Sequence, residues 1–135
     1  MKKRLFSLVA ILLAGCCSEA MAQDMVTGQY EYMNHCASCH GENGQGDGPL
    51  IEILKDPVPD LTVLSRNNEG MFPFHETLMV IDGRKGLRGH GNYMPVWGDT
   101  FERQEMTQAA DDRSYMIAQG RLLSLVEYLV TIQQD

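Results

Sequence analysis

Apolar side chains recur at helical spacing near the carboxyl end of this 135-residue chain. Five of them lie three or four residues apart and so share one helix face. They are Leu122, Leu125, Val126, Leu129 and Ile132. We predict a helix over about residues 113–133, with Gly120 inside it as either a close-packing position or a tolerated weakness that costs about 1 kcal/mol relative to Ala.

Two more helices are predicted upstream. The segment from Thr27 to Cys36 can form a first helix, with Thr27 as its N-cap. A middle helix is predicted over residues 73–82, because Pro73 suits a first helical turn and Gly83 suits the position just past a helix end. No alternating pattern typical of a strand persists along the chain, so the pattern predicts an all-α domain.

The residues between the first two helices are predicted to be irregular. Residues 41–48 are rich in Gly, Asn and Asp, which is typical of a loop. Pro57 and Pro59 disfavour regular structure in the next stretch, where only short helices over about residues 50–55 and near Leu61 are expected. The sequence contains no internal repeat and no low-complexity tract.

The first residues have the pattern of a targeting segment. Three basic residues precede an apolar run of about ten residues over 5–14, which is too short to cross a bilayer. Cleavage after Ala22 would remove a signal peptide of residues 1–22. A lipobox ending at Cys16 is the alternative, and it would give the protein a lipid anchor at that residue.

In either case we expect an exported, periplasmic protein with one folded domain over residues 23–135. No second apolar stretch is long enough to span a membrane. Removal of residues 1–22 would leave 8 basic and 17 acidic residues, and the formal net charge would fall from -7 to -9. Such a surface repels nucleic acid, which is therefore excluded as a partner.

Residues 36–40 form the motif C-x-x-C-H, the sequence to which haem c is covalently attached. Cys36 and Cys39 can each form a thioether with one haem vinyl group, and His40 can offer a ring nitrogen to the iron as an axial ligand. A redox-active dithiol would not need the adjacent His, and a closed zinc site needs four ligands. We therefore expect one haem c, bound through both cysteines.

Four local signatures, which follow one another along the chain in the expected order, resemble those of the class I cytochromes c. Gly28 and Tyr32 precede Cys36 as the small and aromatic residues of the family's first helix do. A second signature is the group Leu125, Tyr128 and Leu129 of the last helix. The third is the segment Gly48-Pro49-Leu50, and the fourth is the pair Met94-Pro95.

The resemblance implies the cytochrome c fold, in which the N- and C-terminal helices cross and a middle helix and loops wrap one covalently bound haem. Gly28 would let the two crossing backbones approach, and Tyr32 would pack on Leu125 or Tyr128.

The resemblance also implies the ligand environment. Met94, 54 residues after His40, would be the second axial ligand, with four other methionines as rivals: Met71, Met79, Met106 and Met116. The backbone carbonyl of Pro49 would accept a hydrogen bond from His40. An ordinary turn proline is the alternative, in which case Pro57 or Pro59 would serve instead.

Further residues are implied near the haem. Trp97 or Arg66 would meet a haem propionate, because an indole N–H and a guanidinium both suit a carboxylate. The alternatives are that Arg66 is an ordinary surface charge and that the aromatic residues are ordinary core residues. Candidates to line the pocket are Tyr93, Trp97, Leu50, Leu61, Phe72 and Phe74. The remaining histidines, His35, His75 and His90, are expected to be non-ligands, and His35 is expected to point away from the haem.

A cluster of basic residues lies in a Gly-rich stretch ahead of Met94: Arg84, Lys85, Arg88 and His90. It is either a solvated loop or a basic patch that orients an acidic partner.

From the resemblance we expect a monohaem, His/Met-ligated carrier of single electrons that is not itself an enzyme. Its partners would be redox proteins, a dehydrogenase as donor and an oxidase or reductase as acceptor, met as a monomer in transient complexes. Two alternatives stay open. The chain could be the haem subunit of a dehydrogenase complex, or it could bind a gas or peroxide if Met94 does not bind iron.

Overall fold

In a computed structural model, residues 26–84, 94–107 and 113–134 are described. An N-terminal helix over residues 26–35 is followed by a turn at Cys36 and by the short helix α2, Ala37–His40. Three 3-10 helices come next, η1 (Ile51–Ile53), η2 (Leu61–Val63) and η3 (Arg66–Asn68). The longer helices are α3 (Phe74–Asp82), α4 (Trp97–Met106) and α5 (Arg113–Thr131).

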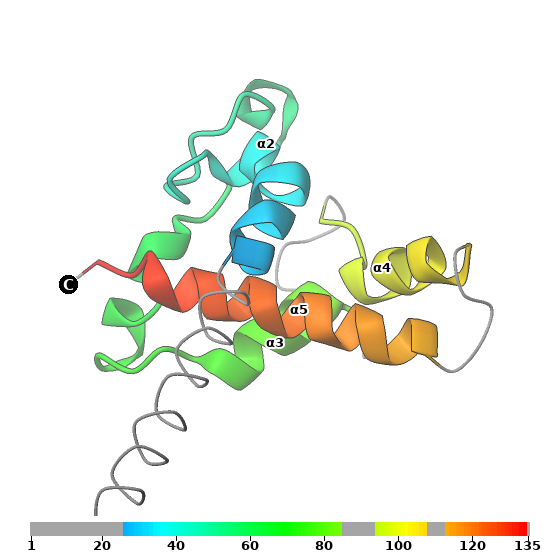
Figure 1. The fold of residues 1–135 in the computed structure, drawn as a ribbon. Helices are drawn as coiled ribbons and strands as arrows, with labels where there is room; N and C mark the ends of the chain where they lie inside the picture. Colours follow the sequence, from blue (N-terminus) through cyan, green and yellow to red (C-terminus); the bar gives the residue numbers. More distant parts are fainter. Residues whose placement is uncertain (1–25, 85–93, 108–112, 135) are drawn as a thin grey trace, which may run out of the picture.

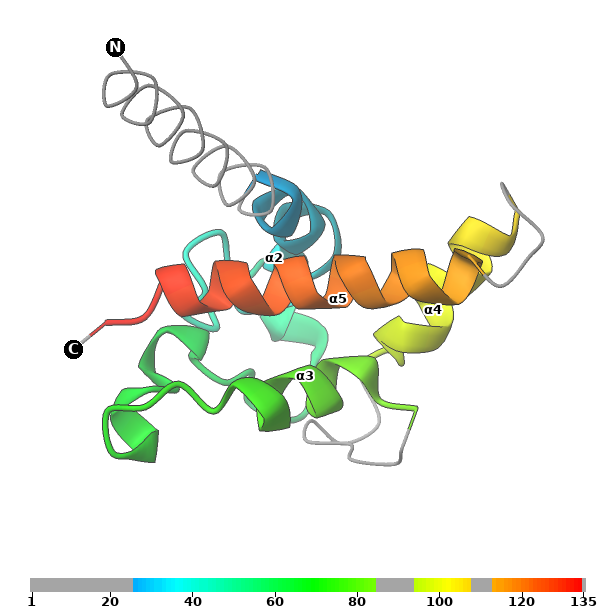
Figure 2. The same cartoon turned by 60° about the horizontal axis from the view of Figure 1, so that its bottom comes forward.

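The described residues form helices, turns and loops without a strand, which confirms the all-α prediction. The long helix α5 lies at the centre of the molecule, with the N-terminal helix crossing one side of it (Figure 1). Helix α3 lies along the other side, and α4 packs against the first half of α5 (Figure 2). The buried core is centred on α5 and comprises mainly Tyr32, Phe101, Leu122, Leu125, Val126 and Leu129.

The crossing of the N-terminal helix and α5 depends on a glycine. A Cβ atom placed at Gly28 would collide with the backbone oxygen of Ser124 and would lie 2.9 Å from the Cβ of Tyr128. The neighbouring Tyr32 is fully buried, and its ring centroid lies 5.3 Å from that of Tyr128. The expected close approach at Gly28 and the packing of Tyr32 are therefore confirmed.

The predicted middle and last helices are present with nearly the expected bounds. Gly83 ends α3 in the left-handed conformation, with a φ of 68°, as its place after the helix predicts. A Cβ atom placed at Gly120 would meet no atom within 4 Å, so this glycine is a tolerated weakness rather than a packing position. Thr27 is not the N-cap of the first helix, because residue 26 is already helical.

Helix α4 was not expected from the sequence, which placed Trp97 in an irregular ligand loop. Trp97 instead begins the helix, and Phe101 one turn later is fully buried against the core. Thr100 adds a bond within this turn, since its hydroxyl donates to the carbonyl of Val96 at 3.0 Å. This helix holds one wall of the site described next.

Candidate haem-attachment site

The C-x-x-C-H motif lies where the N-terminal helix turns into α2. Backbone N–H groups of Cys39 and His40 both donate to the carbonyl of Cys36, at 3.1 and 2.9 Å, which winds the motif into a tight turn. Both thiols are unpaired and partly buried. All three functional side chains line one cavity of about 720 Å³.

This cavity has the properties that a haem group needs. Its volume lies within the range of about 300–1,000 Å³ found for cofactor and ligand sites. Its wall is largely apolar and comes from segments far apart in the sequence: Leu54, Pro57, Val58, Leu61, Leu64, Val80, Ile81, Leu125 and Leu129. The thiols and two side chains able to bind iron, His40 and Met94, share this wall, so the residues present fit haem c.

His40 is almost fully buried, and its ring is held by a proline carbonyl. The Nδ1 atom lies 3.2 Å from the backbone oxygen of Pro59. The expected acceptor, Pro49, is therefore wrong, and the alternative Pro59 is right. Residues 48–50 are bonded back to the motif instead, because the N–H groups of Gly48 and Leu50 donate to the carbonyls of Cys39 and Ser38.

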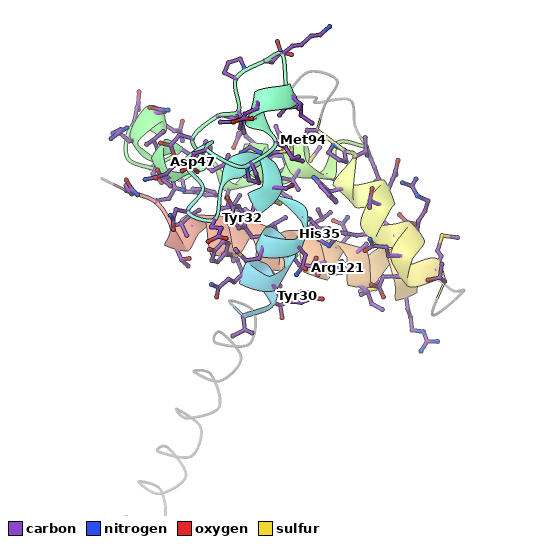
Figure 3. The ribbon with its side chains drawn as sticks, turned by 90° about the horizontal axis from the view of Figure 1, so that it is seen from above. Tyr30, Tyr32, His35, Asp47, Met94 and Arg121 are labelled. Atoms are coloured by element: carbon purple, nitrogen blue, oxygen red, sulfur yellow. The ribbon has the colours of Figure 1, made fainter. Side chains whose placement is uncertain are left out.

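Met94 is the one methionine of the described residues that lines the cavity. Its side chain is half-buried and packs against the apolar core. Among the rivals, Met71, Met106 and Met116 are exposed, and Met79 is partly buried away from the cavity wall. Tyr32, His35 and Met94, which all line this cavity, are labelled in Figure 3.

The residues expected around the haem are only partly found there. Trp97 and Leu61 line the cavity. Leu50 and Arg66 are exposed and do not belong to the wall. Phe72 and Phe74 do not belong to it either. These two phenylalanines instead pack against each other, with ring centroids 6.3 Å apart. Tyr93 lies outside the described residues.

His35 does not point away from the cavity, as expected, but forms part of its wall. Its ring lies 5.1 Å from that of Trp97 and 5.3 Å from that of Phe101. The Nε2 atom is 3.3 Å from a carboxylate oxygen of Glu31. Burial lowers the pKa of His35 from its ordinary value of 6.5, and Arg121 lowers it further, while Glu31 opposes both.

Behind His35 lies a charge network that sequence reasoning missed. Arg121 on α5 donates to both carboxylate oxygens of Glu31 at 2.7 and 2.9 Å, and to Glu105 on α4 at 3.0 Å. Its guanidinium lies over the ring of Phe101, with its Cζ 4.1 Å from the ring centroid. The four-residue spacing of Glu31 and His35 was the only local signal, since Arg121 is 90 residues away.

The Cys36 thiol does not have the lowered pKa that favours a redox dithiol. Burial raises the pKa of the Cys36 thiol to about 12, with Glu31 and Cys39 adding to the effect. A catalytic thiol instead needs a lowered pKa, because the thiolate is the nucleophile. The described residues also contain no group of three or more His, Cys, Asp or Glu side chains placed to hold a metal ion.

Arg84 is the only member of the basic cluster within the described residues. Its guanidinium is paired with Asp82 and with Glu102, at 2.5 and 2.8 Å, and lies over the ring of Tyr115. It therefore joins α3 to α4 rather than facing a partner. Lys85, Arg88 and His90 lie outside the described residues, as do residues 1–25. None of the helices described is long and apolar enough to cross a membrane.

Comparison with known families identifies one match. The model for the family described as cytochrome c oxidase, cbb3-type, subunit III matches residues 23–111. The matched stretch contains the C-x-x-C-H motif, the carbonyl of Pro59 and Met94. No curated protein and no solved structure matches the chain significantly.

Proposed function

Because this chain belongs to the family of cbb3-type cytochrome c oxidase subunit III, a family of c-type cytochromes, we propose that it is an exported carrier of single electrons. Haem c supplies an iron that takes up and gives back one electron. The family indicates electron transfer rather than catalysis by the chain itself. The observation that carries the proposal is that Cys36, Cys39, His40 and Met94 share the wall of one apolar cavity.

Each of these residues has a part in holding the cofactor. Cys36 and Cys39 would bond to one haem through its two vinyl groups. A hydrogen bond donated by Nδ1 of His40 to the Pro59 carbonyl would leave Nε2 free to bind iron and would raise its basicity. The neutral thioether of Met94 would bind the iron as its second protein ligand and would raise the reduction potential. The apolar wall would keep water from the iron, and Trp97 would meet a propionate.

An optical spectrum of the haem-loaded protein tests this ligation. Oxidised wild type should show the weak near-infrared band of sulfur-to-iron ligation, and Met94→Ala should lose it. Met79→Ala, a partly buried methionine away from the cavity, should keep the band. If wild type lacks the band and its reduced form takes up carbon monoxide readily, the iron is open and the protein binds a gas or peroxide instead.

A second candidate is a haem subunit held within a larger dehydrogenase or oxidase complex. The outer face of α5 favours it, because three exposed apolar residues, Met116, Leu123 and Val130, follow each other at seven-residue intervals. Such a stripe is typical of a helix that packs against a partner. Mild purification from the native source distinguishes the two, since a carrier elutes alone and a subunit elutes with a larger enzyme.

The exported state has its own test. The proposed mature protein begins either at Gln23 or at a lipid-modified Cys16. Mass spectrometry of the purified N-terminus identifies which, because acylation adds a defined mass to the cysteine. An intact Met1 on the haem-loaded protein would contradict both alternatives.

A further inference from the structure

The mouth of the haem cavity carries negative charge. Asp56 and Glu76 are among the residues that line the cavity, and both side chains are exposed. They come from different parts of the fold, the segment after η1 and the first turn of α3. Two exposed carboxylates therefore belong to the wall of the cavity that would hold the haem.

An apolar surface adjoins this mouth. Leu50, Ile51 and Ile53 are 42%, 39% and 77% exposed, although they are large aliphatic side chains. Their segment is fastened to the haem-attachment turn, because the N–H of Leu50 donates to the carbonyl of Ser38 at 3.0 Å. Leu50 thus lies next to the haem-attachment turn, and Ile51 and Ile53 follow it along the chain.

The same segment is strongly acidic. Between residues 41 and 65 there are five acidic residues and a single basic one, Lys55. Asp60 is used internally, since its side chain accepts bonds from the N–H and hydroxyl of Thr62. The other four carboxylates of the segment are exposed. With Glu76 and the three aliphatic residues they make up what we call the acidic face: Glu42, Asp47, Glu52, Asp56, Glu76, Leu50, Ile51 and Ile53.

Within residues 41–65 one exposed cation, Lys55, offsets only part of the negative charge of this face. Arg84 is held by Asp82 and Glu102, and Arg121 by Glu31 and Glu105. The acidic face therefore combines exposed aliphatic side chains, a net negative charge and two carboxylates of the cavity wall.

We propose that the acidic face is the docking surface for a basic redox protein. This inference rests on the proposed electron-transfer function and names the kind of partner that function would use. Complementary charge sets the rate and orientation of encounter, while a small apolar centre gives a brief, close contact at the exposed haem edge. A second copy of the chain and an anionic membrane are both repelled by the same carboxylates.

The proposal is the opposite of a basic patch that orients an acidic partner through Lys85 and Arg88. Two sets of charge reversals separate the alternatives. Glu52→Lys/Asp56→Lys changes the acidic face, and Lys85→Glu/Arg88→Glu changes the basic cluster. Glu69→Lys/Glu127→Lys is the matched control, since these residues belong neither to the acidic face nor to the cavity wall.

The readout is the rate at which oxidised, haem-loaded protein is reduced by the cationic hexaammineruthenium(II) and the anionic hexacyanoferrate(II) in stopped flow. For wild type, added salt should slow reduction by the cationic reagent and speed reduction by the anionic reagent, because it screens attraction in the one case and repulsion in the other. Glu52→Lys/Asp56→Lys should slow the cationic reagent at low salt by about tenfold or more, the scale of electrostatic steering. Poly-L-lysine should slow the cationic reagent in wild type and in the control, but not in this variant.

Several results would overturn the proposal. Equal losses in the acidic-face variant and the control would show a net-charge effect only. A large effect of Lys85→Glu/Arg88→Glu on the anionic reagent, with none from the acidic face, would support the basic cluster. A salt-dependent dimer that Glu52→Lys/Asp56→Lys strengthens or weakens would assign the face to a second copy. Haem that neither reagent reduces would instead contradict the proposed function itself.

Discussion

The pair of Arg121 and Glu31 shows what a single residue contributes to this molecule. Glu31 is 4% exposed, and its carboxylate is satisfied by two hydrogen bonds from one guanidinium. Removing one member of a buried pair leaves a charge with neither water nor a partner. The two residues also join the N-terminal helix to α5, close to the wall of the cavity.

We expect Arg121→Ala to lower the free energy of unfolding of the haem-loaded protein by about 3 kcal/mol, because the buried carboxylate of Glu31 would lose its permanently charged partner and keep only His35 beside it. Denaturant titration measures the change. Arg103→Ala on the exposed face of α4 is the control and should change stability by less than about 0.5 kcal/mol. Equal effects of the two substitutions would contradict the importance of the buried pair.

His35 should make stability depend on pH. Its pKa is lowered in the folded protein, chiefly by burial, so the unfolded chain binds a proton first as pH falls below the ordinary value of 6.5. Wild type should therefore lose stability between pH 6.5 and the lower folded pKa. His35→Phe should lose less over this range, whereas His75→Gln, at an exposed position on α3, should follow wild type. Unfolding curves at a series of pH values provide the test, and parallel profiles for wild type and His35→Phe would refute it.

At this scale the sequence predicts what is local. Cys36, Cys39 and His40 lie within five consecutive positions of one motif, and their common cavity wall follows from the turn they form. Pro59 could not be preferred over Pro49 on spacing alone. The choice depends on how residues 48–50 bond back to the motif. It is then the segment with Pro59 that lies against the ring of His40.

At the scale of helices, two glycines have opposite roles. Gly28 lies where two backbones touch, and Gly120 lies on the open face of α5. Gly120→Ala should raise the free energy of unfolding by about 0.5–1 kcal/mol, because Ala is the better helix former and meets nothing there. Gly28→Ala should lower it by about 1–3 kcal/mol through overpacking at the crossing.

Thermal unfolding of the two haem-loaded variants beside wild type is a direct comparison. The same chemical change is made in both, so helix propensity is matched and only the surroundings differ. Stabilisation by Gly28→Ala would show that the helices do not cross as closely as described.

Helix α4 shows why one element escaped prediction. Its apolar signal is confined to Trp97 and Phe101, one turn apart, whereas α5 repeats the pattern over five positions. Two positions do not separate a helix from a loop. What fixes α4 is tertiary: Phe101 is buried against the core, and Arg84 bonds Glu102 from the end of α3.

At the scale of the whole molecule, the cavity makes the fold dependent on its cofactor. A space of about 720 Å³ between apolar walls is too large to stay open in a domain of this size. Cys36→Ala/Cys39→Ala, made without haem, should therefore unfold without a sharp transition and lose its near-ultraviolet dichroism. Ser38→Ala, an exposed change in the same turn, should keep the haem and the cooperative transition. A sharp transition in the haem-free double variant would contradict this dependence.

The global arrangement was predictable only where a family resemblance supplied it. The crossing of the first and last helices and the place of Met94 were expected on that ground. The bond from Arg121 to Glu31 was not, because it joins residues 90 positions apart that have no spacing to reveal them.

The end of α5 is fastened to the cavity wall by two residues. The side chain of Gln133 accepts from the N–H of Ser65 and donates to the carbonyl of Leu61, and the N–H of Gln134 donates to the carbonyl of Thr62. These bonds link the last described residues of the chain to the segment that carries Leu61, a residue of the cavity wall. The enclosure around the haem is therefore complete only when the carboxyl end of the chain is in place.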